Sequence, residues 1–188
     1  MKILAINRTL DQSVNDIINH LAIIPDSAII REGKPFFIPR FSQNWKYQAT
    51  IAFRVTRLGK NIAAKFAYRY IDALALAVRT IPIDLEASAT QSAITTAFDG
   101  AFIIGQWIEL NNFESNNNIS IEFDNQAFSL DISQLAIEET IALLSKYITL
   151  KIGDIIAPAI IPISENITIN TIIDGNLNNT PNIKLKFK

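Results

Sequence analysis

Short apolar runs bounded by Gly, Pro, Asn or Asp recur along the chain and predict a strand-rich fold. Hairpins are expected where two such runs flank a short polar turn. We expect strands over residues 2–6, 49–55 and 101–104. A first hairpin is expected to pair 119–123 with 127–131 around a turn at 124–125. A second is expected to pair 167–173 with 183–187, with a polar loop between them that opens at Asp174-Gly175.

Apolar residues spaced three or four apart predict two helices, over residues 11–21 and 134–147. Asp11 can cap the first and Ser133 the second, because both side chains can accept a hydrogen bond from a backbone N–H of the first turn. Residues 62–79 fit a helix by propensity. They also fit a buried strand in their second half, since apolar residues alternate there with Ala, and periodicity alone does not decide.

Composition limits the domain organisation. The chain has 188 residues, 49% hydrophobic and 19% charged, which is too apolar for a disordered protein. This length suits one domain, and no Pro/Gly/Ser-rich linker interrupts it. We therefore expect a single domain over residues 1–188.

Charge and rare residues exclude several classes of function. The formal net charge of −1 does not favour a nucleic-acid partner. Cys is absent, which excludes thiol nucleophiles and Cys-bound metals, and there is one histidine, His20. Apolar runs such as 160–163 are far shorter than the roughly 18–20 residues of a membrane span, so no membrane partner is expected. The first residues lack an export pattern, and we expect a cytoplasmic location.

A search for catalytic motifs finds none. The chain has no glycine-rich phosphate loop, no Gly-x-Ser-x-Gly turn and no carboxylates at metal-ligand spacing. His20 lies beside apolar residues and is interpreted as a partly buried or surface histidine. Asp84 and Glu86 are interpreted as part of a solvated surface.

Five phrases nevertheless occur in order and at characteristic spacing: PDSAII at 25–30, GKPFFIP at 33–39, LGKNIAAKFAYRY at 58–70, FDG at 98–100 and TLKIGDII at 149–156. Together they resemble the fumarylacetoacetate hydrolase family, most of all its short bacterial members that are little more than the catalytic domain. Each phrase is weak alone, but five in register across essentially the whole chain are specific.

The resemblance implies an α+β fold, a strand-rich roll of packed mixed β-sheets with two or three short helices, and a homodimer. It also implies a strand after the phrase at 58–70, which divides 62–79 into a short helix and a strand from about Ile71 to Thr80. Members of the family bind Mg²⁺ or Mn²⁺ through three carboxylates and hydrolyse or decarboxylate 2-oxo acids or β-diketones.

The chain departs from the family pattern at the positions that the resemblance assigns to the metal. Where the family has His-Tyr-Glu-x-Glu, this chain has Gln48 and Thr50 in place of the two Glu ligands. Arg79 stands where the family has its third ligand, an Asp. Four further site positions of the family are altered, and they correspond to Ser13, Ile24, Thr96 and Pro158.

These substitutions remove the carboxylates that a hard divalent cation requires, and they add a cation. We therefore expect no metal, no cofactor and no catalytic residue. The predicted function is that of a catalytically inactive family member that binds a small carboxylate or an unidentified protein. The alternative is a metal-independent hydrolase or lyase acting on a 2-oxo acid or β-diketone, with His20, Asp84, Asp99 or one of the Glu residues as base.

Arg79 is the candidate anion-binding residue, because a guanidinium can hold a carboxylate through two parallel hydrogen bonds. The other interpretation is a surface or intramolecular ion pair, with Asp84 as a candidate partner. The former cleft is either filled by apolar residues, among them Ile24 and Ile160, or open with Arg79 facing inward.

Overall fold

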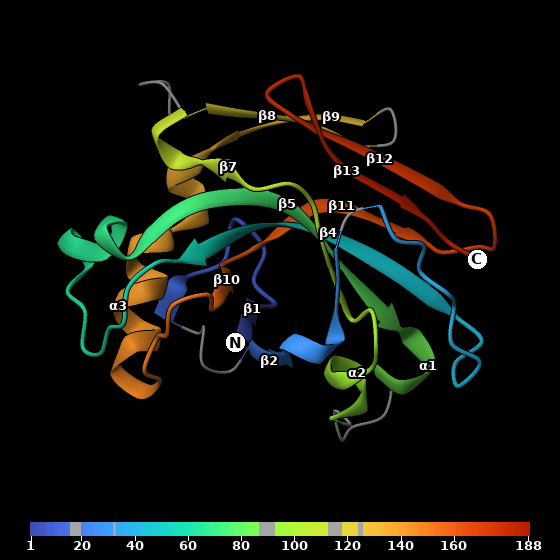
Figure 1. Cartoon of the computed structure of the whole chain (residues 1–188), viewed down its shortest axis with the longest axis horizontal. Helices are drawn as coiled ribbons and strands as arrows, with labels where there is room; N and C mark the ends of the chain where they lie inside the picture. Colours follow the sequence, from blue (N-terminus) through green and yellow to red (C-terminus); the bar gives the residue numbers. More distant parts are fainter. Residues whose placement is uncertain (16–19, 32, 87–92, 113–117, 124–125) are drawn as a thin grey trace.

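The computed structural model describes residues 1–15, 20–31, 33–86, 93–112, 118–123 and 126–188, and it shows two β-sheets with short helices around them (Figure 1). Within these residues the larger sheet has nine strands in the order β2-β1-β10-β4-β5-β6-β3, with β11 also pairing with β4 and β7 with β5. Its strands are β1 (Lys2–Ile6), β2 (Leu21–Pro25), β3 (Ile29–Arg31), β4 (Trp45–Val55), β5 (Ile71–Pro82), β6 (Phe102–Ile104), β7 (Ile108–Glu109), β10 (Ile155–Ala157) and β11 (Ile160–Asn166).

The smaller sheet packs on one face of β4 and β5 (Figure 1). It has the order β13-β12-β8-β9, and its strands are β8 (Asn118–Phe123), β9 (Gln126–Asp131), β12 (Ile172–Leu177) and β13 (Thr180–Lys186). Tyr47 of β4 contacts Phe123 of β8, with 5.8 Å between the ring centroids. Since side chains alternate along a strand, Gln48 and its even-numbered neighbours face the other side of the larger sheet.

The helices are short and lie at the edges of the sheets. They are the 3₁₀ helices η2 (Asp26–Ala28), η3 (Ala64–Tyr70), η4 (Leu110–Asn112) and η5 (Ile132–Leu135) and the α-helices α1 (Ile83–Glu86), α2 (Ile94–Ala97) and α3 (Ile137–Tyr147). Helix α3 buries Ile137, Ile141 and Leu144 and packs against η3 at one end of the molecule (Figure 1). The expected strand-rich α+β fold is therefore confirmed, and so is the division of 62–79 into a short helix and a long strand.

Two of the predicted helices need correction. Leu21 is not helical: it begins β2, where the backbone pairs with Ile6 of β1. Residues 16–19 of that predicted helix lie outside the described residues. In the second helix Ser133 is not the cap, because the Asp131 carboxylate caps η5 by accepting the Ser133 N–H at 2.9 Å. Ala136 then adopts a left-handed conformation with φ 49°, and α3 begins only at Ile137.

The last hairpin turns later than its sequence suggests. Asn178 and Asn179 connect β12 to β13 with φ of 49° and 59°, the left-handed conformation that tight hairpin turns require. Asp174-Gly175, the expected opening of the polar loop, lies inside β12 instead. A Cβ on Gly175 would lie 2.7 Å from Ile183 and 2.9 Å from Phe123, so this glycine serves close packing between strands rather than a turn.

Candidate functional site

The structure brings Gln48, Thr50 and Arg79 onto one face of the larger sheet. Gln48 pairs directly with Arg79 in the antiparallel ladder of β4 and β5, and Thr50 pairs with Ala77. Residues paired in such a ladder point to the same face, and so do residues two apart on one strand. The three positions that the family resemblance singled out are therefore neighbours in space.

Arg79 is buried, with 6% of its surface exposed. Its guanidinium donates a hydrogen bond to the Asn7 side-chain oxygen. Asn7 follows β1, and its backbone N–H donates to the His20 carbonyl at 2.9 Å. The sequence did not identify Asn7, because a single Asn after a short strand carries no signal of its partner 72 residues away.

A second buried arginine, Arg8, lies next to Asn7 and was also missed. It is 2% exposed, and its guanidinium donates to the carbonyls of Gln12 and Leu135 at 2.8 and 3.1 Å. Burial lowers the pKa of the Arg8 guanidinium. These hydrogen bonds fix the segment after β1 against η5, and they hold Asn7 beside Arg79.

Thr50 is fully enclosed and joins β4 to the segment around Pro158. Its hydroxyl donates to the Ala159 carbonyl at 2.7 Å, and 2% of the residue is exposed. Pro158 is also buried and lies between β10 and β11, the strand that pairs with β4. The altered loop and the altered strand position thus contact each other.

The remaining predicted positions lie on other elements. Ile24 is buried in β2 opposite Ile3. The Thr96 hydroxyl, in α2, donates to the Ala93 carbonyl at 3.2 Å. Helix α2 packs next to β2, so the elements that carry these two positions are neighbours. Ser13 is exposed and accepts a hydrogen bond from the Asn15 N–H at 3.2 Å.

Asp84, the candidate ion-pair partner of Arg79, is engaged with the turn that precedes β4. Its carboxylate accepts hydrogen bonds from the Ser42 hydroxyl at 2.8 Å, from the Asn44 side-chain amide at 2.7 Å and from the backbone N–H groups of Gln43 and Asn44 at 2.7 and 3.1 Å. These bonds, with the Asn44 and Ser42 side chains contributing most, hold the pKa of the Asp84 carboxyl well below its ordinary value. The Arg79 guanidinium donates to Asn7, while the Asp84 carboxylate accepts hydrogen bonds from the turn at residues 42–44.

Comparisons with known proteins agree with the resemblance. The model of the family described as fumarylacetoacetate (FAA) hydrolase C-terminal matches residues 7–158. A comparison with proteins of curated function gave no match.

Among solved structures, a fumarylpyruvate hydrolase from Pseudomonas aeruginosa in complex with Mn²⁺ and pyruvate aligns with a TM-score of 0.81 at 16% identity, covering 100% of this chain and 89% of that one. A 5-carboxymethyl-2-hydroxymuconate delta-isomerase from Mycobacterium smegmatis aligns with a TM-score of 0.82 at 16% identity, covering 99% and 78%. A maleylpyruvate hydrolase from Sphingobium sp. SYK-6 gives 0.77 at 15% identity, covering 99% and 69%. At these identities the alignments establish the fold.

The residues at the assigned metal positions do not fit Mg²⁺ or Mn²⁺. A guanidinium has no lone pair to donate, Gln48 offers a neutral carboxamide, and the Thr50 hydroxyl already donates to a carbonyl. Among the residues that the structure describes, no three His, Cys, Asp or Glu side chains are grouped so as to hold a metal ion. In the same part of the chain no helix has the length and apolar character needed to cross a bilayer.

Proposed function

This chain belongs to the fumarylacetoacetate hydrolase family, and we propose that it acts there as a metal-free binding module rather than as a hydrolase. The observation that carries the proposal is the buried Arg79 beside Gln48. A buried cation raises the free energy of any divalent cation placed next to it, because the interior screens charge poorly. The same cation favours an anion.

The ligand class that suits this face is a small carboxylate. The Pseudomonas aeruginosa relative is in complex with Mn²⁺ and pyruvate. In this chain Arg79 supplies a positive charge of its own, in a side chain whose planar geometry matches a carboxylate. Asn7 holds the guanidinium in place, so little side-chain entropy is lost on binding. As the resemblance implies, we further propose a homodimer. We also propose a cytoplasmic location.

The metal arm of the test is thermal unfolding with and without millimolar Mn²⁺ or Mg²⁺. A ligand at about 100 times its dissociation constant stabilises a protein by about 2.7 kcal/mol, which corresponds to roughly 5–11 °C for a chain of this size. For this protein we expect Mn²⁺ or Mg²⁺ to raise the Tm by less than about 1 °C. A shift of several degrees would show a divalent-metal site and overturn the proposal.

The carboxylate arm uses calorimetric titration with pyruvate. Asn7→Asp places a carboxylate against Arg79 with almost no change of shape, and we expect it to abolish pyruvate binding while the fold persists. Asn111→Asp, which makes the same change at an exposed residue, should bind as the unmodified protein does. Equal binding by Asn7→Asp would exclude Arg79 as the anion site. Hydrolysis of an acylpyruvate by the metal-free protein would instead support a metal-independent hydrolase.

A further inference from the structure

Two segments of the chain carry cations without any carboxylate. Residues 57–71 and 140–153 contain six of the seventeen Lys and Arg residues and none of the eighteen Asp and Glu residues. The formal net charge of −1 therefore hides an uneven distribution. A local excess of this kind attracts anionic partners regardless of the overall charge.

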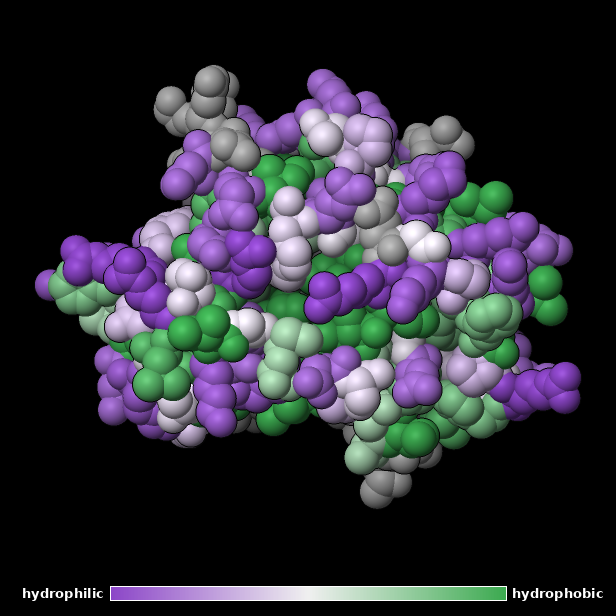
Figure 2. Space-filling view, in the orientation of Figure 1, coloured by the Kyte–Doolittle hydropathy of each residue, from purple (hydrophilic) through white to green (hydrophobic). Residues whose placement is uncertain are grey.

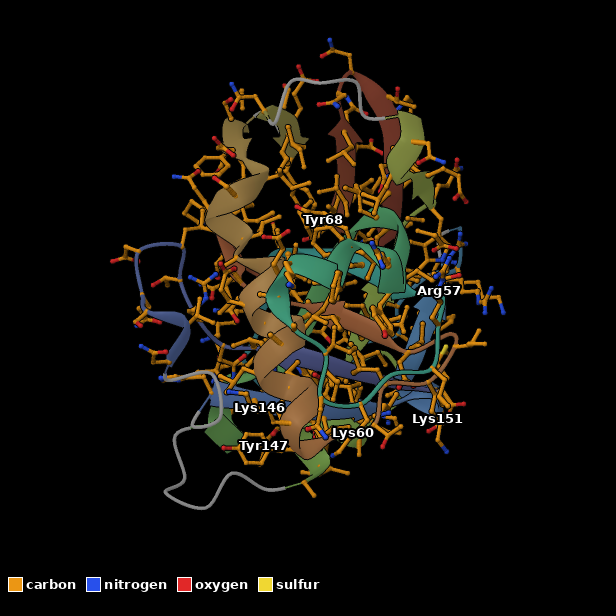
Figure 3. All side chains as sticks on the ribbon, turned by 90° about the vertical axis from the view of Figure 1, so that its left-hand side faces the viewer. Arg57, Lys60, Tyr68, Lys146, Tyr147 and Lys151 are labelled. Atoms are coloured by element: carbon orange, nitrogen blue, oxygen red, sulfur yellow. The ribbon has the colours of Figure 1, made fainter. Side chains whose placement is uncertain are left out.

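The fold joins these two segments at the end of the molecule formed by α3 and η3. Gly59 and Leu150 exchange backbone hydrogen bonds of 3.0 and 2.9 Å. The Ile62 N–H donates to the Ser145 hydroxyl of α3 at 2.8 Å. The turn at 57–61 is thus fixed against the C-terminal end of α3, and Arg57, Lys60, Lys146 and Lys151 all project from this side of the molecule (Figure 3).

Apolar side chains protrude among these cations. Leu58 is 68% exposed, Tyr147 63% and Ile152 71%. They come from three separate places: the turn at 57–61, the end of α3 and the loop before β10. Figure 2 shows hydrophobic and hydrophilic residues side by side over this end of the molecule. We call the four cations of the preceding paragraph together with these three residues the basic face.

No ion pair is seen for the cations of the basic face among the residues that the structure describes. Within the described parts of the chain, the ion pairs involve other residues, such as Lys2 with Asp154 and Arg54 with Asp72. The side chains of Lys60 and Lys146 are exposed and can contact an external partner.

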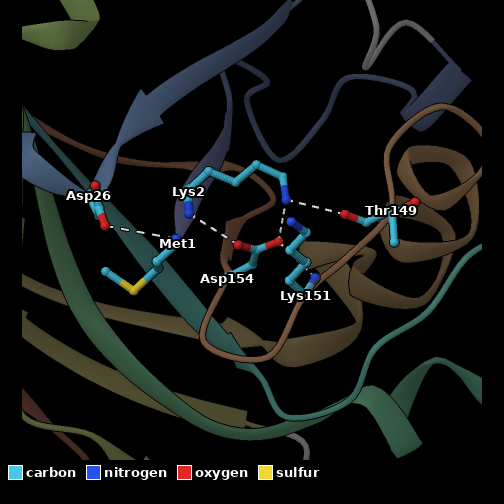
Figure 4. A network of polar contacts seen from close by, with 6 residues as sticks. All are labelled: Met1, Lys2, Asp26, Thr149, Lys151 and Asp154. Carbon is cyan, nitrogen blue, oxygen red and sulfur yellow. Dashed lines mark hydrogen bonds and ion pairs between the residues drawn. The ribbon is translucent and has the colours of Figure 1, made fainter.

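The loop that carries Lys151 and Ile152 is held in a fixed shape (Figure 4). The buried Asp154 carboxylate accepts hydrogen bonds from the Lys151 N–H at 2.8 Å, from the Lys2 N–H at 3.0 Å and from the Lys2 ammonium. That ammonium also donates to the Thr149 carbonyl at 3.2 Å. Because these hydrogen bonds already order the loop, it loses little conformational entropy on binding.

We propose that the basic face binds the surface of an anionic phospholipid membrane. The lysines and arginine contact the headgroup phosphates, while Leu58, Tyr147 and Ile152 enter the boundary between headgroups and acyl chains. A second copy of the chain fits less well, since a twofold interface would place like charges against each other. A nucleic acid would account for the cations but not for the exposed Leu and Ile.

The test is co-sedimentation with vesicles of phosphatidylcholine alone or with about 30% phosphatidylglycerol, at low salt. We expect binding only to the anionic vesicles, and release at about 0.5 M salt. Lys60→Gln combined with Lys151→Gln should weaken binding about 25-fold, roughly fivefold for each cation. Leu58→Ser combined with Ile152→Ser should weaken binding several-fold without any change of charge. In the Tyr147→Trp variant, the fluorescence of the introduced indole should be quenched by brominated lipid.

A matched control removes the same charge elsewhere. Lys34→Gln combined with Lys186→Gln changes exposed residues near the C-terminus, at the opposite end of the molecule, and should leave vesicle binding unchanged. Equal weakening in this control, or no binding of the unmodified protein to anionic vesicles, would overturn the proposal. Tighter binding to an acidic protein or a single-stranded oligonucleotide, insensitive to the Leu58 and Ile152 changes, would also overturn it. Asn7→Asp should still bind vesicles, so this proposal and the proposed carboxylate site fail separately.

Discussion

Two groups of cations lie in this molecule in opposite environments. Arg8 and Arg79 are buried beside the ends of the sheet strands, and oxygen atoms of the protein accept hydrogen bonds from both. Lys60, Lys146 and Lys151 are exposed at the end formed by α3 and η3 (Figure 3). A buried charge must be compensated inside the protein, whereas an exposed charge is compensated by water and by whatever binds there.

The environment of a cation in this protein, and not its residue type, determines which kind of partner it can contact. For Arg79, which is buried, the proposed partner is a small ligand at the face beside Gln48. The lysines of the basic face can act on an extended surface. The two proposals accordingly give the two groups separate kinds of partner, a small carboxylate and an anionic membrane surface.

The largest expected loss of stability follows from removing the carboxylate beneath the basic face. Asp154→Ala removes the carboxylate that pairs with the Lys2 ammonium and leaves two backbone N–H groups without their acceptor. We expect the free energy of unfolding, measured in urea, to fall by about 3 kcal/mol or more. Asp174→Ala removes a carboxylate from an exposed pair with Lys184 and should cost less than about 1 kcal/mol. Equal losses would show that Asp154 does not fix the loop.

A smaller effect separates the two groups of cations directly. Arg79→Ala removes a buried side chain and the hydrogen bond to Asn7, and we expect it to cost about 2 kcal/mol in urea unfolding. Lys60→Ala removes an exposed cation and should stay within about 0.5 kcal/mol. If both changes had the same effect, the distinction between buried and exposed cations would not hold energetically.

The smallest expected effect concerns pH and the turn that precedes β4. Because hydrogen bonds keep the pKa of Asp84 well below its ordinary value of 3.8, the unfolded chain takes up a proton at this position first as the pH falls. Its stabilisation is therefore complete above about pH 5, declines below about pH 4 and disappears below the folded-state pKa. The difference in Tm between the unmodified protein and Asp84→Asn should follow this curve. Asp99→Asn, at an exposed carboxylate, is the control; a Tm difference for Asp84→Asn that does not change with pH would contradict the assignment.

Most of the strands and the fold class can be predicted from the amino-acid sequence, because the apolar pattern within each short segment reflects which faces are buried. It also singled out Gln48, Thr50 and Arg79 through the family phrases around them. It misplaced local boundaries, namely the start of α3 and the last hairpin turn. These boundaries depend on the left-handed backbone conformations of Ala136, Asn178 and Asn179, which a pattern of apolar residues does not indicate.

Contacts between residues that are distant in the sequence depend on the tertiary structure. Asn7 reaches Arg79 because β1 enters the same sheet as β4 and β5. The basic face exists because the Gly59–Leu150 pair joins two segments that residues 72–139 separate in sequence. Hydrophobic burial follows local composition, which a sequence displays directly. Contacts between polar residues follow the topology of the chain, and each short segment is compatible with many such contacts until the sheets have formed.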